Sequence, residues 1–564
     1  MPGIQQLFRE HDWLRIHRDN LRAIAERLRS QLKNSITTVL QRKDLLAIAI
    51  LVLITAIVRV PGVFNRAIWY DEAITLLETA GNAAPTWSAL PTPAATQKEL
   101  LVGSPSLGEV AAGLRETDVH PPVYYGLLSK WRRIAGGSIE AARFFSVLCS
   151  TATVILLYLL LGSFGFKRPF WPSLVYSLSS GAVHYAHEAR NYSLAMFFVI
   201  LAAFLAYFLT HIEVNRQLQF WILSSSIAVS CGLAFQTNYL TVFPIFIVLA
   251  WCIAWVPKRR RLHVIPTIIL SAMISLAGFS TLTAQLGARP NQFQKTLGFG
   301  QELVKIIEAN FEILWSPVMS SSGIRWTVIG TVLGLVLLSA AYLKAGWSAI
   351  DKKLFTLMAG LAIAPSLGVL ALDLLFSKSL GKTSYVLFGG PAVVFLLTLA
   401  VGEGSVRKPG DSHWSAAALA RSVGFVIPFF IGLQLTGINF DLERTPNFAG
   451  STLRSLVANI EQKNRSPVVV VGAGHGRGDP ATVIYELAPE TMVCVVDNES
   501  DLSSLRAKLA HFEEIWIVFA KGRTTAAAEE SLFEVLTKNG AYRVVSRSKR
   551  VAHLKKTRHG FDGA

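Results

Sequence analysis

The sequence predicts a polytopic α-helical membrane protein with about eleven transmembrane helices, followed by a soluble C-terminal α/β domain. Of its 564 residues, 52% are hydrophobic and only 16% are charged, whereas about 25% of the residues in a soluble globular protein are charged. The mean hydropathy of +0.42 points the same way. Apolar runs long enough to cross the ~30 Å hydrocarbon core recur along most of the chain, so one membrane domain accounts for most of its length.

The charge pattern indicates membrane orientation and argues against a nucleic-acid partner. The formal net charge is +17. The basic residues gather in short loops between apolar runs, as in residues 258–261, which the positive-inside rule explains. Three of the four cysteines, Cys149, Cys231 and Cys252, lie within apolar runs, and Cys494 stands alone. Neither a disulfide framework nor a thiolate metal site is therefore expected.

The membrane domain is expected at residues 45–437, after a basic amphipathic segment, residues 1–44, on the cytoplasmic membrane surface. The first apolar run begins near Leu45, too late for an ordinary cleaved signal peptide, so we interpret it as a retained span. The spans are predicted at residues 45–61, 140–163, 169–187, 191–210, 219–236, 238–256, 263–284, 325–344, 353–376, 384–402 and 416–437.

Residues 123–134 decide the topology. The segment is apolar, but it is too short to cross and it ends in basic residues. If it lies flat in the interface, the basic residues 258–261 and 352–353 all face the cytoplasm, as the positive-inside rule requires. We therefore expect the long first outer loop, residues 61–139, on the extracytoplasmic face together with the C-terminal domain.

Residues 438–564 are expected to form this extracytoplasmic α/β domain, because short β-rich runs alternate with helical stretches. The glycines between residues 472 and 478 resemble a nucleotide-binding loop. However, the G-x-G-x-x-G pattern requires glycine where this chain has Arg477 or, with a later start, Asp479. A strand-to-helix turn explains these glycines better. The predicted strands are residues 468–471, 492–496, 515–519 and 542–546.

Unusual polar residues crowd at outer helix ends and in the first loop, whereas the middles of the spans carry almost no charge. This pattern is typical of a site at the membrane surface rather than of an ion-coupled transporter. The first cluster contains Asp71 and Glu72. One carboxylate could be a general base and the other a structural or substrate contact. Equally, Asp71 could cap a short surface helix, and the sequence does not choose between these readings.

The second cluster contains Asp118 and His120, followed by two prolines that fix the start of a helix. A helix N-terminus with a cation beside it favours an anion such as phosphate. An interfacial helix start with its aromatic residues explains the same pattern equally well.

The third cluster contains Glu188 and Arg190. Arg190 lies at the outer surface against the positive-inside trend, and its planar fork of donors suits phosphate. His184 and His187 are three residues apart and could share a divalent metal with Glu188. Isolated histidines at helix ends are much commoner, so no metal or other cofactor is assigned.

The fourth cluster, beside the outer end of a late span, contains Lys382 and Tyr385, and a snorkelling lysine would explain it. Taken in order, the four clusters resemble the protein O-mannosyltransferase-like family of GT-C glycosyltransferases (glycosyltransferase family 39), which is related to the bacterial aminoarabinose transferases. Ser384 stands where that family often has arginine, and Lys382 could supply the charge. The matching motifs are Asp71-Glu72, His120-Pro121-Pro122 with Tyr124 and Tyr125, Glu188-Ala189-Arg190 with Tyr192, and Thr383-Ser384-Tyr385.

The resemblance implies an enzyme of a bacterial inner membrane that moves a sugar from a polyprenyl phosphate to a hydroxyl of a lipid, glycan or protein outside the cytoplasm. It implies Asp71 as the base, with inversion at the anomeric carbon. The alternatives are a lipid-linked glycan transporter, which needs polar residues through the full membrane depth, and a non-catalytic scaffold, which needs no intact site. The implied substrate contacts are Glu72, Asp118, His120, Tyr124, Glu188, Arg190, Tyr192, Lys382 and Tyr385.

Overall fold

The fold is described from a computed structural model of the chain. It divides into two compact units, Met1–Ile54 and Thr55–Ala564. In the first unit, the described part is the beginning of the apolar helix α2 (Arg42–Asn65), which confirms the first expected span. Nearly all of the expected surface segment before α2 lies outside the described residues. The structure describes residues 42–166, 168–211, 217–288, 298–315, 351–376, 382–400, 468–472, 478–496, 499–519, 526–538, 541–547 and 551–557.

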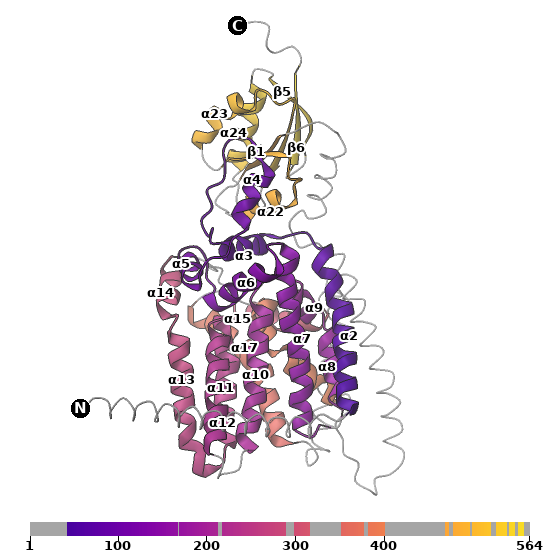
Figure 1. Cartoon of the computed structure of the whole chain (residues 1–564), viewed down its shortest axis with the longest axis vertical. Coiled ribbons are helices and arrows are strands. Elements are labelled where there is room, and N and C mark those ends of the chain that lie inside the picture. Colours follow the sequence, from indigo (N-terminus) through magenta and orange to yellow (C-terminus); the bar gives the residue numbers. More distant parts are fainter. Residues whose placement is uncertain are drawn as a thin grey trace, which may run out of the picture. The chain divides into compact units, whose positions relative to one another are not determined.

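In the described part of the chain, 5 helices are long and apolar enough to cross a membrane, or up to 6 if one bent pair forms a single span. The bent pair combines residues 258–276, which are η3 (Lys258–Val264) and α13 (Ile265–Leu276), with α14 (Phe279–Ala288), at an angle of 48°. The helices of the second unit pack side by side (Figure 1). The 5 spans are α2, α7 (Ile139–Ser163), α10 (Tyr192–His211), α11 (Gln217–Phe235) and α17 (Lys352–Phe376).

Several other expected spans differ from continuous membrane-crossing helices. The one at residues 169–187 is divided at Ser179, whose backbone is extended. Those at residues 238–256 and 384–402 are shorter apolar helices, and two others, the eighth and the eleventh (325–344 and 416–437), lie outside the described residues. The elements at these positions are α8 (Phe170–Leu178), α9 (Ser180–Ala186), η2 (Tyr239–Thr241), α12 (Val242–Trp255), α18 (Thr383–Val386), η6 (Leu387–Gly389) and α19 (Gly390–Ala400).

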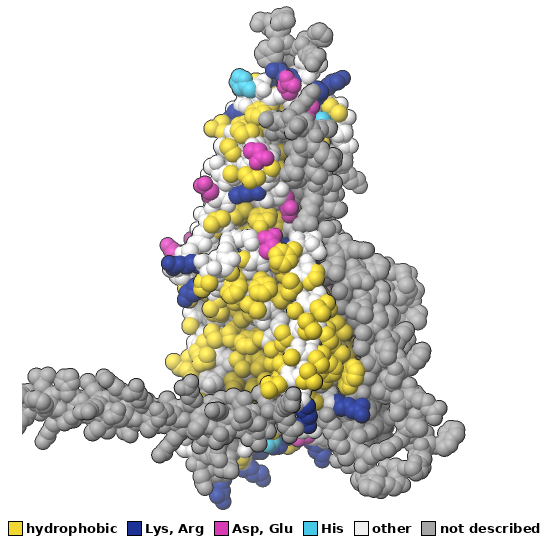
Figure 2. Space-filling view, turned by 45° about the vertical axis from the view of Figure 1, so that its right-hand side comes forward, with side chains coloured by type: hydrophobic (Ala, Val, Ile, Leu, Met, Phe, Trp, Pro, Cys, Tyr) yellow, Lys and Arg dark blue, Asp and Glu magenta, His cyan; other side chains and the backbone are white. Residues whose placement is uncertain are grey.

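The surface of the helical part is apolar. Figure 2 shows a broad band of hydrophobic side chains across it, with Lys and Arg side chains at the lower edge of the band. Large apolar side chains point outward along α13 and α17, among them Ile269, Met273, Leu367 and Leu374. A continuous apolar surface of this kind is unfavourable in water but favourable in contact with the hydrocarbon tails of lipids. The protein is therefore a multi-pass membrane protein.

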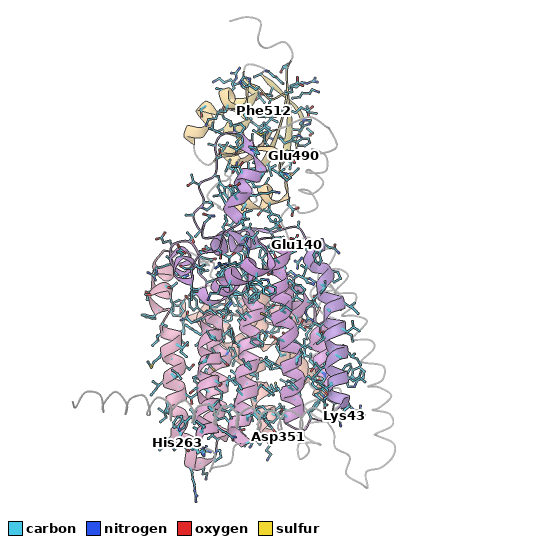
Figure 3. All side chains as sticks on the ribbon, in the orientation of Figure 1. Lys43, Glu140, His263, Asp351, Glu490 and Phe512 are labelled. Carbon is cyan, nitrogen blue, oxygen red and sulfur yellow. The ribbon has the colours of Figure 1, made fainter. Side chains whose placement is uncertain are left out.

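Two loops with basic residues lie at the same end of these helices. The Trp251 indole in α12 donates a hydrogen bond to the Lys353 carbonyl (2.9 Å), and Lys353 Nζ lies 5.9 Å from the ring centre of Trp255. Figure 3 shows His263 and Asp351 at this end and Glu140 at the opposite end. Because two predicted spans, 263–284 and 325–344, separate these loops, a common end is expected whether or not residues 123–134 cross the membrane.

Those residues lie in α6 (Pro122–Ala135), which has 14 residues. A helix of this length measures about 21 Å, shorter than the ~30 Å hydrocarbon core. The basic end of α6 makes hydrogen bonds within the first loop. The buried guanidinium of Arg132 donates to the carbonyls of Leu76, Leu101 and Gly137. The other helices of the loop are α3 (Tyr70–Ala80), α4 (Ala94–Lys98), η1 (Glu99–Leu101) and α5 (Leu107–Thr117).

The C-terminal residues form a mixed sheet with one short strand from the first loop. The strand order is β1-β3-β2-β4-β6-β5, with β2 parallel to β3 and β4, and the other pairs antiparallel. The four valines of β2 are all buried, because α22 packs on one face and α23 and α24 on the other. The four expected strands are confirmed, whereas β1 and β6 were not predicted. The elements are β1 (Thr92–Pro93), β2 (Val468–Gly472), α22 (Gly478–Glu486), β3 (Met492–Val496), α23 (Glu499–Leu509), β4 (Glu514–Phe519), α24 (Ala526–Thr537), β5 (Tyr542–Arg547) and β6 (Val551–Lys556).

Candidate active site

The two adjacent carboxylates at the start of α3 have different environments, and Glu72 is enclosed by protein. Arg143 of α7 donates from Nε to Oε1 (2.8 Å) and from Nη2 to Oε2 (2.6 Å), and the Ala189 N–H donates to Oε1 (3.0 Å). The side chains of Glu72 and Arg143 are each 1% exposed. This bidentate pair connects α3 to α7 and to the turn before α10.

Arg143 also determines the charge state of Glu72. Burial by itself would raise the pKa of the Glu72 carboxyl, but the charge and hydrogen bonds of Arg143 outweigh burial and hold that pKa below its usual value. Arg143 donates further hydrogen bonds to the carbonyls of Val63, Arg66 and Ala67. Glu72, expected as a substrate contact, is therefore already occupied by structural partners.

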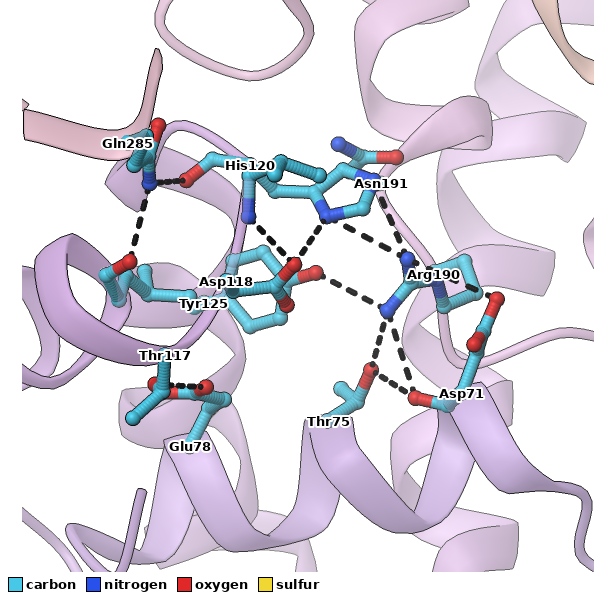
Figure 4. A network of polar contacts seen from close by, with 12 residues as sticks. Asp71, Thr75, Glu78, Thr117, Asp118, His120, Tyr125, Arg190, Asn191 and Gln285 are labelled. Carbon is cyan, nitrogen blue, oxygen red and sulfur yellow. Dashed lines mark hydrogen bonds and ion pairs between the residues drawn. The ribbon is translucent and has the colours of Figure 1, made fainter. Parts of the chain in front are cut away.

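The Asp71 side chain is accessible to solvent, whereas the Glu72 side chain is enclosed by protein. The two differ because successive residues of a helix point about 100° apart. The Asp71 side chain is 35% exposed, and its Oδ2 lies 3.9 Å from Nη2 of Arg190, whose side chain is 4% exposed (Figure 4). The structure thus places an accessible carboxylate beside a buried guanidinium.

Arg190 lies at the centre of the polar network in Figure 4. Its Nη1 donates to the hydroxyls of Tyr125 (3.1 Å) and Thr75 (3.3 Å) and to the Asp71 carbonyl (3.3 Å), while its Nη2 faces the His120 ring. Burial would lower the pKa of Arg190, but Tyr125 and Asp71 are the strongest of several neighbours that outweigh burial and raise it. The guanidinium is therefore charged and held in place from several sides.

Asp118 and His120 form a pair next to Arg190. His120 Nδ1 lies 2.8 Å from Asp118 Oδ1, and Arg190 Nη2 lies 3.1 Å from His120 Nε2. Because a guanidinium only donates, Nε2 accepts from Arg190, and Nδ1 carries the proton that it donates to Asp118. Burial would raise the pKa of Asp118, but His120 and Arg190 hold it well below its usual value. His120 thus connects a carboxylate to the central guanidinium.

The two tyrosines of α6 are both fully buried, but only one of them reaches the network. The Tyr125 hydroxyl contacts Arg190, whereas the Tyr124 hydroxyl lies 3.3 Å from Ser146 Oγ in the helical core. Tyr124 was the expected substrate contact. Its position is that of a core residue, and Tyr125 is the member of the motif that touches the site.

The third and fourth clusters meet the first two through aromatic side chains. Tyr192 of α10 follows Arg190 by two residues, and Tyr385 of α18 packs against the same buried cluster as Tyr192. All four sequence clusters are therefore close together in space, although they are separated by long stretches of chain.

Ser384 and Lys382 explain how this chain departs from the family motif. Ser384 lies near the side chains of Tyr185 and Tyr192, whose ring centres are 4.9 Å apart. A small polar side chain beside two aromatic rings thus stands at position 384 in place of a cation. Lys382 is exposed, and its Nζ lies 5.9 Å from the ring centre of Tyr385, so a cation is present near this position.

The histidines of the third cluster are not gathered around a metal position. Glu188 Oε1 lies 2.9 Å from His184 Nε2, and the Glu188 side chain is 5% exposed. The His187 ring is buried against Gly62 of α2, at a spot where an added Cβ would lie 2.3 Å from the ring. Within the described residues, no group of three or more His, Cys, Asp or Glu could hold a metal ion.

Several residues of the site were not recognised from the sequence. Thr75 lies one helical turn after Asp71, and Gln285 reaches the His120 carbonyl from α14 (Figure 4). Neither residue type carries a signal of its own. Arg143 did carry one, because an arginine inside an apolar run needs an internal partner.

Comparisons with known proteins agree with this architecture. The model of the family described as dolichyl-phosphate-mannose-protein mannosyltransferase matches residues 119–284, which include His120 and Arg190. No curated protein was matched in sequence. The crystal structure of ArnT from Cupriavidus metallidurans bound to undecaprenyl phosphate is similar, with a TM-score of 0.50 at 12% identity over 91% of this chain and 98% of that chain.

The apo crystal structure of the same ArnT has a TM-score of 0.51 at 11% identity, over 90% of this chain and 97% of that chain. At such low identity, the likeness concerns the fold, and it extends over nearly the full length of both chains. The chain is therefore a membrane protein with the GT-C glycosyltransferase fold.

Proposed function

We propose that this protein is a membrane glycosyltransferase that moves a sugar from a polyprenyl-phosphate donor to a hydroxyl group outside the cytoplasm. The observation that carries the proposal is the open Asp71 carboxylate, 3.9 Å from the buried and firmly held Arg190 guanidinium. A base beside an anion site is the minimum that such a transfer needs. The undecaprenyl phosphate bound in one structure of the same fold supports this donor class.

In the proposed reaction, Asp71 accepts the proton of the acceptor hydroxyl while the hydroxyl oxygen attacks the anomeric carbon of the sugar. The bond from that carbon to the phosphate oxygen breaks, and the phosphate leaves with the electron pair. Because a phosphate is a good leaving group, the step needs charge stabilisation more than a strong acid, and Arg190 supplies it. Attack from the side opposite the phosphate inverts the configuration at the anomeric carbon.

The other predicted site residues divide into two groups in this proposal. Asp118 and His120 hold Arg190 and shape the phosphate position, with Lys382 as a second cation at its edge. Tyr192 and Tyr385, which pack in one apolar cluster, would contact the sugar. The positions of Glu72, Glu188 and Tyr124 favour structural roles.

The proposed orientation places the first loop and a soluble domain of residues 438–564 outside the cytoplasm of a bacterial inner membrane, after about eleven spans. Reporter fusions after Arg261 and after Ala564 test it. We expect the first reporter in the cytoplasm and the second outside, and both reporters on one side would contradict the topology.

Mass spectrometry of envelope lipids, glycans and glycoproteins from cells with and without the gene tests the function. We expect the loss of one sugar from one class of acceptor. An unchanged profile in all three classes, under conditions where the protein is produced, would favour the scaffold alternative.

A further inference from the structure

The turn after α11, residues 236–239, makes hydrogen bonds to two segments of the candidate site. The Gln236 carbonyl accepts a hydrogen bond from the N–H of Val123 (3.1 Å), at the start of α6. The Thr237 carbonyl accepts one from the Nδ2 of Asn191 (2.7 Å), the residue after Arg190. The turn therefore contacts the backbone that follows His120 and the side chain that follows Arg190.

We propose that this turn and Gln285 form a positioning device for His120 and Arg190, an inference that rests on the proposed function. Gln285 Nε2 donates to the carbonyls of His120 and Leu114 (3.0 Å each), and its Oε1 accepts from the Tyr239 hydroxyl (3.0 Å). Both amide hydrogens and the amide oxygen are thus used, which fixes the amide orientation. Gln285 connects the turn to the carbonyl of a site residue, as Figure 4 shows for His120.

A bend in the membrane helices brings Gln285 to this position. α13 and α14 meet at 48°, and the Gln236 amide at the bend donates to the carbonyls of Ile274 (3.2 Å) and Ser275 (2.6 Å). Carbonyls at a helix break need such a donor. Gly278 leaves room for it, since an added Cβ would lie 2.5 Å from Gln236 Oε1. Gln236 therefore stabilises the bend, and the bend places Gln285 over the first loop.

This device contributes position rather than chemistry, because its hydrogen bonds go to the backbone near His120 and to Asn191 rather than to Asp71 or the Arg190 guanidinium. A displacement on the order of 1 Å at a reacting group can lower the rate about 10²-fold. Gln285→Met keeps the side-chain length but removes all three hydrogen bonds. We expect it to lower kcat by roughly tenfold or more, while the donor KM changes by less than about threefold.

Gln97→Met is the matched control. Gln97 is 3% exposed, as is Gln285, and its Nε2 also donates to a buried carbonyl, that of Val493, but it lies in α4 beside the sheet. It should lower thermal stability by a similar amount and leave kcat unchanged. The inference is overturned if Gln285→Met keeps kcat within about twofold of wild type. It is also overturned if Gln97→Met lowers kcat as much as Gln285→Met does.

A smaller change covers the case in which Gln285→Met does not fold. Tyr239→Phe removes one hydroxyl and one hydrogen bond to Gln285, and we expect kcat to fall severalfold. Wild-type kcat in Tyr239→Phe would then overturn the inference.

Hydrogen–deuterium exchange of the peptide that contains His120 and Val123 separates this inference from the proposed function. Gln285→Met should speed exchange there whether or not the protein transfers a sugar. If exchange becomes faster but the protein uses no polyprenyl-phosphate donor, the positioning role is supported and the proposed enzymatic function is wrong. If exchange in this peptide is unchanged, the positioning role of Gln285 is wrong.

Discussion

Replacing Arg143 with methionine tests whether the buried pair with Glu72 holds the site together. The change keeps a long side chain but removes every hydrogen bond that Arg143 donates to Glu72 and to the end of α2. Glu72 would remain as a buried carboxylate without its cation. Breaking a buried ion pair from one side costs about 3–5 kcal/mol, a large share of the ~5–15 kcal/mol that typically stabilises a folded protein.

The double variant Glu72→Gln/Arg143→Met gives the decisive comparison, because it removes the charge as well as its partner. It should be more stable than Arg143→Met alone, although less stable than wild type. Thermal unfolding of the detergent-solubilised proteins at pH 7 measures this order. Arg143→Met with the melting temperature of wild type, or a double variant below the single one, would refute the reasoning.

The pH dependence of the same melting temperature provides an independent check. The folded protein lowers the pKa of Glu72, so its stabilising contribution is complete above the unfolded value of about 4.3 and is lost as the pH falls through the folded value. Wild type should therefore lose more stability on acidification below about pH 4 than Glu72→Gln, in which this position does not titrate. Parallel acid profiles for the two proteins would contradict this assignment.

Three further predictions concern the site and its support. Arg190→Ala should weaken donor binding and lower turnover together, because the phosphate contact exists in the bound state and strengthens as charge develops; binding assays and kinetics separate the two effects. Tyr125→Phe should lower turnover severalfold by removing a hydrogen bond to Arg190, whereas Tyr124→Phe should leave turnover unchanged in the same assay. Gly478→Ala should reduce both turnover and melting temperature, because an added Cβ would lie 2.9 Å from the carbonyl oxygen of Tyr70, the first residue of α3; wild-type values for both would show that α22 adapts freely.

The order of motifs along the chain was enough to predict that distant clusters meet. Asp71, His120, Arg190 and Tyr385 are each unremarkable alone, but they all follow or precede apolar runs at one predicted membrane face. The structure brings these four side chains together. Polar residues at the ends of helices that leave the same membrane face lie close to one another, so the predicted topology and the family resemblance together pointed to one site.

What topology could not decide is which member of each motif faces the site. Asp71 and Glu72 are adjacent carboxylates, and only the position of Arg143 shows that Glu72 is the enclosed one. Tyr124 and Tyr125 are likewise indistinguishable until the helix is placed against its neighbours. These choices depend on tertiary partners, which a local pattern does not contain.

The support behind the site was equally invisible in the sequence. Gln285 is a common polar residue directly after the segment predicted as a span at residues 263–284, and its role follows from a bend that no proline marks. Gly278, at the break between α13 and α14, and Gln236, in the turn after α11, meet at that bend although they are far apart in the sequence. The hydropathy pattern of one span predicts a straight helix and says nothing of contacts with other segments. Contacts such as that between Gly278 and Gln236 are therefore seen only in the three-dimensional structure.

The turnover of Asp71→Asn shows most directly whether Asp71 is the catalytic base. The protein, in lipid nanodiscs, would be given a polyprenyl-phosphate sugar donor, and transfer to the acceptor and donor affinity would be measured separately. If Asp71 is the base, turnover falls by roughly 10²–10⁴-fold, while the donor Kd stays within about threefold of wild type. A folded Asp71→Asn protein with near wild-type turnover would contradict the account.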